Sequence, residues 1–177
     1  MKKFLSIFLI IIIFLIIYFL QANVFNGFKI FNVKPNLFII FAMLIGLFLG
    51  REYGFIWGVV LGLILDLFIG RNIGTNSISL GIVGFMAGVL EKNFSNESRF
   101  TIMIFTIMLT FLSETVTYVM QIILNSGSIN LVEFIKIILI EILYNVIIVI
   151  IIYPTFQRLG KYLEGVFYDR NKTIHYY

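Results

Sequence analysis

Six long apolar stretches constrain this chain more than any other feature of its sequence. They lie at about residues 4–20, 36–50, 53–70, 76–90, 101–124 and 132–153. Such runs are apolar on every helical face, so we expect lipid and not water around them. In hydrocarbon each backbone N–H must bond within its own segment, which makes each run a helix despite its many β-branched residues. The sequence therefore predicts an all-α, polytopic membrane bundle of about six transmembrane helices.

The overall composition agrees with this class. Of the 177 residues 60% are hydrophobic and only 12% are charged, against roughly 25% charged in soluble domains. Six crossings with short loops use the whole length, so residues 1–177 are expected to form a single integral membrane domain. The absence of cysteine excludes disulfides and thiolate metal sites. The small net charge of +4 lies mostly at the ends and loops, where it indicates topology and not nucleic-acid binding.

The distribution of Lys and Arg predicts the orientation. On alternating sides, nine lie on one side and three or four on the other. The richer side holds Lys2, Lys3, Arg51, Lys92, Arg99, Arg158, Lys161, Arg170 and Lys172, and the other holds Lys29, Lys34, Arg71 and at most Lys136. Positive loops stay in the cytoplasm, so both termini are expected there. A cleaved signal peptide is the alternative for residues 4–20, but this stretch exceeds a usual apolar signal region and lacks an Ala-x-Ala site.

Glycine is concentrated in the middle of the chain, where ten of the fourteen lie between Gly46 and Gly88. One stripe of a predicted helix carries a residue of interest at every fourth position, namely Gly54, Gly58, Gly62 and Asp66. At this spacing all four lie within about 120° of the helix circumference. A glycine stripe lets another helix approach closely, which favours a packing seam. Asp66 is expected to accept hydrogen bonds from its own following turn and so lock the loop to the next helix. A contact with a partner or ligand is the alternative.

Two further carboxyl groups lie near the middle of predicted helices. Glu114 belongs to a polar seam on one face of residues 101–124, and Glu141 lies in the helix at 132–153. The other members of the seam are Thr106, Thr110, Thr117 and Gln121. Both carboxyl groups should face the bundle interior, because facing lipid would be costly. Hydrogen bonding between helices is one interpretation, and a polar cavity or proton path is the other.

Catalysis finds little support in the sequence. The single histidine, His175, lies in the C-terminal tail, and no metal-ligand cluster or Gly-rich phosphate loop is present. A lone intramembrane Asp cannot form an aspartate dyad. We therefore expect a protein that is not an enzyme and uses no cofactor.

One segment of about 30 residues resembles a known family. It runs Gly62-Leu-Ile-Leu-Asp66-Leu-Phe-Ile-Gly70-Arg-Asn-Ile-Gly74, then Ser79-Leu-Gly81 and Gly84-Phe-Met-Ala-Gly88. This segment resembles the rod shape-determining MreD family. The shared features are a Gly-Leu-x-x-Asp-Leu motif, glycines four and eight residues after the Asp, and a following helix with regularly spaced glycines. The sequence departs from it in having Asn72-Ile73 where Pro-Leu is common.

The resemblance implies a non-enzymatic subunit of the bacterial elongation complex in the cytoplasmic membrane. Its implied partners are a bitopic MreC-type protein, the cytoplasmic MreB-type filament and peptidoglycan synthases. Its implied fold is similar to the substrate-binding subunits of energy-coupling-factor vitamin transporters. The outer end of the helices predicted at 53–70 and 76–90 would be held in the shape that a partner recognises by Asp66, Gly70 and Gly74. The rival functions are a vitamin-type transporter subunit and an intramembrane enzyme or proton-coupled carrier that uses Glu114 and Glu141.

Overall fold

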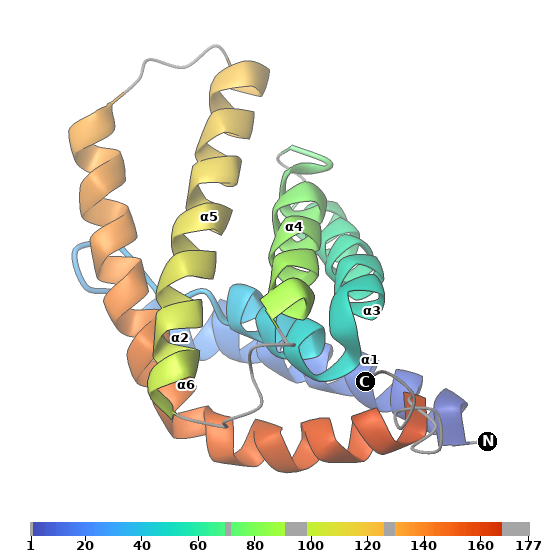
Figure 1. The fold of residues 1–177 in the computed structure, drawn as a ribbon. Coiled ribbons are helices and arrows are strands. Elements are labelled where there is room, and N and C mark those ends of the chain that lie inside the picture. Colours follow the sequence, from blue (N-terminus) through green and yellow to red (C-terminus); the bar gives the residue numbers. More distant parts are fainter. Residues whose placement is uncertain (1, 70–71, 91–98, 126–129, 168–177) are drawn as a thin grey trace.

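The computed structural model describes residues 2–69, 72–90, 99–125 and 130–167. The long elements in these ranges are all helices (Figure 1), which confirms the predicted all-α class. The five long helices are α1 (Lys2–Phe19), α3 (Leu37–Ile69), α4 (Thr75–Leu90), α5 (Arg99–Asn125) and α6 (Leu131–Phe167). A π-helical turn, η1 (Leu20–Val24), and the short α2 (Phe25–Gly27) continue α1 toward the loop that precedes α3.

The ranges predicted as two helices, 36–50 and 53–70, form one element that is broken at Gly50. Gly50 has φ +79° and ψ 175°, a conformation that glycine adopts readily and other residues rarely do. The chain changes direction there, so that the second half of α3 (residues 51–69) runs beside α4 (Figure 1). Arg51 and Glu52, directly after the break, are exposed.

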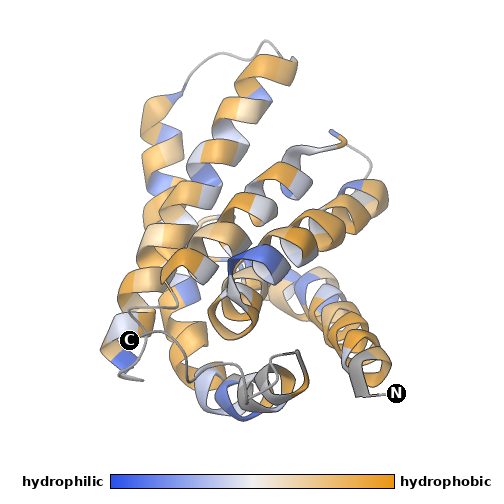
Figure 2. Cartoon of the chain, turned by 45° about the vertical axis from the view of Figure 1, so that its right-hand side comes forward, coloured by the Kyte–Doolittle hydropathy of each residue, from blue (hydrophilic) through white to orange (hydrophobic). Residues whose placement is uncertain are grey.

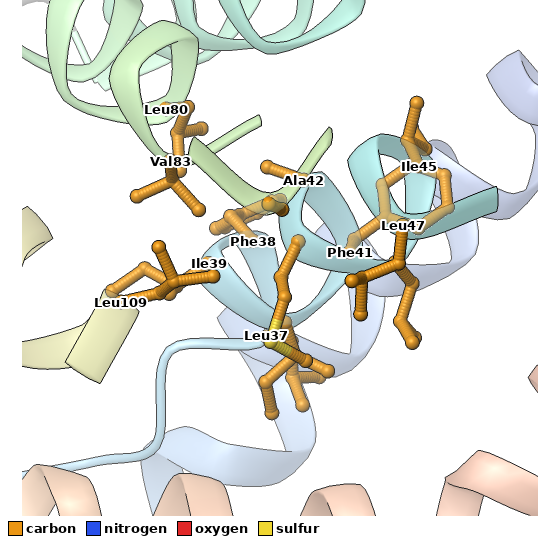
Figure 3. Close-up of a cluster of buried hydrophobic side chains, with 14 of the residues drawn as sticks. Leu37, Phe38, Ile39, Phe41, Ala42, Ile45, Leu47, Leu80, Val83 and Leu109 are labelled. Atoms are coloured by element: carbon orange, nitrogen blue, oxygen red, sulfur yellow. The ribbon is translucent and has the colours of Figure 1, made fainter. Parts of the chain in front are cut away.

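The first half of α3 (residues 37–49) lies at the centre of the molecule. Its side chains are buried on nearly every face, and Ile39, Met43 and Leu49 are at most 1% exposed. Figure 3 shows this segment meeting Leu80 and Val83 of α4 and Leu109 of α5. A helix that is apolar all round is a core helix, and here it is surrounded mainly by the other helices of the chain.

The outer faces of the helices are apolar. Figure 2 shows that hydrophobic residues make up most of the helices, and many of them are exposed, including Leu143 and Ile151 on α6 and Phe111 on α5. Large apolar surfaces of this extent need lipid around them. Four stretches are long and apolar enough to cross a bilayer, namely Phe4–Gly27, Leu37–Phe68, Arg99–Leu124 and Leu131–Thr155. The chain is therefore a multi-pass membrane protein.

Length and composition do not by themselves give the six predicted crossings. Two of the predicted helices share α3, and α4 with its 16 residues falls short of the roughly 20 that a perpendicular crossing requires. Helix α6 is longer than predicted and continues past Pro154 to Phe167. Figure 1 shows α6 as bent, as expected for a helix with an interior proline. Its last part packs Gly160 against the ring of Phe48 in α3.

Candidate functional site

The predicted glycine stripe faces α4 inside the same chain. A Cβ added to Gly54 would meet the carbonyl oxygen of Gly84, and one added to Gly58 would meet that of Leu80. A Cβ on Gly62 would lie 2.5 Å from the carbonyl oxygen of Asn76, well inside ordinary van der Waals contact. The backbones of α3 and α4 are therefore in close contact at all three glycines, as a packing seam requires. Because α4 covers the stripe, another helix can reach only the outer faces of this hairpin.

Asp66 closes the far end of the α3–α4 hairpin. Its side chain is 1% exposed, and its Oδ2 accepts hydrogen bonds from the N–H groups of Gly74 (2.9 Å) and Ser77 (3.1 Å). Its Oδ1 accepts from the backbone N–H (3.1 Å) and the Nδ2 (2.8 Å) of Asn76. These donors lie at the start of α4, where backbone N–H groups lack partners within the helix. A carboxylate is also favoured there by the helix dipole.

Through these hydrogen bonds the end of α3 caps the start of α4. Gly74 contributes the turn, with φ +101°, a backbone conformation that other residues adopt only with strain. Gly70 lies outside the described residues. A contact of Asp66 with a partner or ligand stays a hypothesis.

Serine side chains bind α4 to its other neighbours. The hydroxyl of Ser79 lies 2.7 Å from that of Ser113 and donates to the Ser113 carbonyl at 3.1 Å, which joins α4 to α5. The hydroxyl of Ser77 donates to the carbonyl of Val59 on α3 at 3.1 Å. One of these contacts therefore lies within the hairpin, and the other joins the hairpin to α5.

Glu114 and Glu141 approach each other where α5, α6 and the start of α3 come together. Glu114 is half-buried and Glu141 is buried. Glu141 is 6% exposed, and it interacts with Glu114 and with the amide side chains of Asn36 and Asn145. The Oδ1 of Asn145 accepts from the backbone N–H of Asn36 at 2.8 Å, and its Nδ2 donates to Thr110 at 3.1 Å. Among the described residues, no hydrogen-bond partner lies near Oε1 of Glu141 or Oδ1 of Asn36.

The rest of the polar seam of α5 turns inward only along its first half. Thr106 and Thr110 are buried, Thr117 is half-buried and Gln121 is exposed. The Thr106 hydroxyl donates to the carbonyl of Ile102 in its own helix at 2.8 Å. The seam therefore ends where α5 moves away from the core.

Two adjoining cavities meet at Glu141 and Lys34, which line both. The inner cavity, of about 290 Å³, is also lined by Tyr18, Gln21, Asn36, Phe38 and Asn76, and the outer one, of about 460 Å³, by Phe31, Asn32, Glu133 and Lys136. Partial burial, and then the nearby charge of Lys29, lower the pKa of Lys34 below the usual lysine value. In the part of the chain that the structure describes, no group of three or more metal-ligating side chains is close enough to hold a metal ion.

The model of the rod shape-determining protein MreD family matches residues 1–163. The chain belongs to the MreD family. It is therefore a non-enzymatic membrane protein of rod-shape determination. No curated protein and no solved structure matches the chain, so the predicted similarity to vitamin-transporter subunits stays a prediction.

The MreD-like sequence motif and the polar cavities lie in different parts of the fold. The motif at residues 62–88 forms the α3–α4 hairpin with its glycine seam and Asp66. Sequence reasoning did not single out Gln21, Lys34 or Asn36 for the cavity. The available signal was Pro35-Asn36 directly before an apolar helix, because Asn is favoured as an N-cap residue and its side chain then lies at a helix end.

Proposed function

We propose that the chain is a membrane scaffold subunit of the bacterial elongation complex, in which the α3–α4 hairpin receives the transmembrane helix of a bitopic MreC-type partner. The observation that carries the proposal is the close backbone contact between the two helices of the hairpin. Its two backbones are in direct contact along the glycine seam, and Asp66 ties its outer end with four hydrogen bonds. A fixed surface loses little conformational freedom when a helix docks on it.

An apolar groove on the outer side of the hairpin supports this choice of surface. It measures about 540 Å³, and it is lined by Phe55, Ile56, Ile82, Phe85 and Met86 with Arg51 and Glu52 at one end. The rings of Phe55 and Phe85 meet edge to face at 6.4 Å. Apolar surface alone does not drive association between helices in lipid, so shape and close packing decide where a partner binds. A concave groove offers such packing.

The charged pair after Gly50 supports six crossings with both termini in the cytoplasm. Arg51 and Glu52 are exposed, and a charged side chain facing lipid in the middle of a span is costly. If the chain reaches water at Gly50 and returns, both side chains are solvated and each half of α3 is a separate crossing. In that orientation the subunit would share one complex with the MreB-type filament and the cell-wall synthases. The filament would contact it from the cytoplasmic side.

Depletion of the native protein with complementation by variants tests the scaffold role. Phe85→Ala should reduce both recovery of the MreC-type partner on co-purification and restoration of rod shape. Phe111→Ala removes another exposed phenylalanine, from α5, and serves as the control. Asp66→Asn and Gly62→Leu should weaken partner recovery through the shape of the hairpin. Full recovery and normal rods with Phe85→Ala, at normal expression, would exclude the groove as the docking surface.

A vitamin-type substrate-binding subunit is the second candidate, and the inner polar cavity beside Glu141 is the observation that favours it. Such a subunit should retain its ligand through purification. Mass spectrometry that finds a vitamin bound in stoichiometric amount would favour this candidate over the scaffold. A protein purified without one would argue against it.

A further inference from the structure

The outer polar cavity lies between the loop that precedes α3 and the beginning of α6. Its lining takes Phe31, Asn32 and Lys34 from the loop and Glu133 and Lys136 from α6, and Figure 1 shows the loop beside that helix. The Nζ of Lys136 lies 4.9 Å from the centroid of the Phe31 ring, so the two segments are in contact. A cavity of about 460 Å³ is within the size range of small-molecule sites, roughly 300–1,000 Å³.

The loop that forms one wall of this cavity is held by hydrogen bonds within the chain. Ile30 and Val33 exchange both of their N–H to carbonyl bonds, at 3.0 and 2.9 Å, across a turn whose two central residues have positive φ. The hydroxyl of Tyr144 donates to the carbonyl of Phe28 at 2.7 Å and ties the loop to α6. This wall is therefore ordered without a ligand, so less ordering is needed on binding.

Two lysine ammonium groups in the cavity wall lack an acidic partner. Lys34 and Lys136 both line the cavity, and neither forms an ion pair with another residue in the described ranges. Partial burial and the nearby Lys29 lower the pKa of Lys34, and a bound anion would act in the opposite direction. The Phe31 ring covers one side of the Lys136 ammonium, which leaves other N–H groups able to donate. The wall therefore offers charged donors that the chain itself does not use.

The position of the cavity indicates a lipid as the source of an anion. Lys34 lies in the loop between the first two candidate membrane spans, and Lys136 lies near the start of the last one. The ends of spans lie at the level of the lipid headgroups, which lysine side chains reach. Phe28, Ile30 and Phe31 of the same loop are each more than half exposed. Exposed apolar side chains beside lysines are typical of segments that lie in the membrane interface.

We propose that the outer polar cavity binds the phosphate of an anionic phospholipid headgroup through the ammonium groups of Lys34 and Lys136. Lysine ammonium groups carry rotatable N–H donors on long flexible stems, so both can turn to one phosphate. The acyl chains lie along the exposed apolar side chains of the loop. The inference goes beyond the scaffold role and does not depend on it, because the docking groove shares no residue with this cavity.

The two acidic side chains of the wall affect a bound phosphate to different degrees. Glu133 is exposed, and its Oε2 accepts from Nδ2 of Asn130 at 3.3 Å, so its carboxylate repels a phosphate in the same cavity. Glu141 is 6% exposed and offers little carboxyl surface to a ligand. Loss of the Glu133 charge should therefore strengthen binding, whereas loss of either lysine weakens it. A ligand without net charge would show neither effect.

Native mass spectrometry of the full-length protein in detergent tests the choice of ligand. Phosphatidylglycerol should bind at least about fivefold more tightly than phosphatidylcholine, whose headgroup has no net charge. Glycerol phosphate, measured by calorimetry, carries a phosphate without acyl chains and should bind at least about tenfold more weakly than the lipid. Equal affinity for the two lipids would overturn the proposal. Glycerol phosphate that binds as tightly as phosphatidylglycerol would also overturn it, by assigning the cavity to a free phosphate ester.

Charge variants test the residues of the cavity. Lys34→Gln and Lys136→Gln should each weaken phosphatidylglycerol binding by about fivefold, and Glu133→Gln should strengthen it. Arg99→Gln is the matched control, because it removes one positive charge from the exposed start of α5, which does not line the cavity. It should change binding by less than about twofold. Unchanged binding by both lysine variants, weaker binding by Glu133→Gln, or an equal loss with Arg99→Gln would overturn the proposal.

Discussion

The seam between α3 and α4 gives the sharpest prediction, because one methyl group tests it. In Gly62→Ala the new Cβ would lie 2.5 Å from the carbonyl oxygen of Asn76 and 2.6 Å from the Cα of Ser77. Ordinary contact begins at 3.4 Å, so the two backbones must separate by about 0.9 Å. The atoms in the way are backbone and not the ends of flexible side chains. They also belong to the turn that Asp66 holds, so the turn cannot yield alone.

The expected loss of stability follows from overpacking. Forcing an extra methyl group into a well-packed interface costs about 1–3 kcal/mol. For a chain of this size that corresponds to a melting temperature lower by about 2–12 °C. Gly165→Ala is the matched control, because a Cβ there meets nothing within 4 Å. Its position in α6 means that alanine should be neutral or stabilise by up to about 1 kcal/mol.

Fluorescence of Trp57 measures both variants in detergent. It is the single tryptophan of the chain, it lies in α3 one residue from Gly58, and it packs against the hydrophobic core. Gly62→Ala should melt at a lower temperature than the unmodified protein, and Gly165→Ala should not. Equal melting temperatures for both variants and the unmodified protein would refute the backbone contact on which the rigid hairpin depends.

Three further perturbations test other parts of the molecule. Asp66→Asn keeps one acceptor oxygen and should destabilise the protein by about 1–3 kcal/mol, measured by the same melting experiment; an unchanged melting temperature would contradict the capping role. The chain lacks cysteine, so Arg51→Cys and Asn32→Cys can be labelled singly with an impermeant maleimide in intact and in opened cells. Six crossings require labelling of Arg51→Cys from the cytoplasm only and of Asn32→Cys from outside. Tyr144→Phe removes a 2.7 Å hydrogen bond to a carbonyl of the loop before α3 and should speed proteolysis in that loop, whereas an unchanged rate would show that the bond does not hold it.

Sequence periodicity could predict contacts within one helix and between neighbours along the chain. The glycine stripe and Asp66 follow from a spacing of four residues, and the partner of that stripe is the next helix. The same reasoning placed Glu114 and Glu141 in the interior, because lipid excludes carboxyl groups. It could not bring Asn36 to them, because that contact spans 109 residues from Asn36 to Asn145. The same reasoning predicted two separate helices for the two halves of α3. It did so because a break within one helix at Gly50 and a loop between two helices have the same amino-acid composition.

Asp66 and Glu141 show two ways in which this fold accommodates an acidic side chain in an apolar helix. Both oxygens of Asp66 accept hydrogen bonds, so the charge is satisfied by the chain itself and fixes its shape. Glu141 is nearly as buried, yet one of its oxygens has no hydrogen-bond partner among the described residues. The difference in hydrogen bonding, and not the difference in burial, is therefore what separates these two acidic side chains.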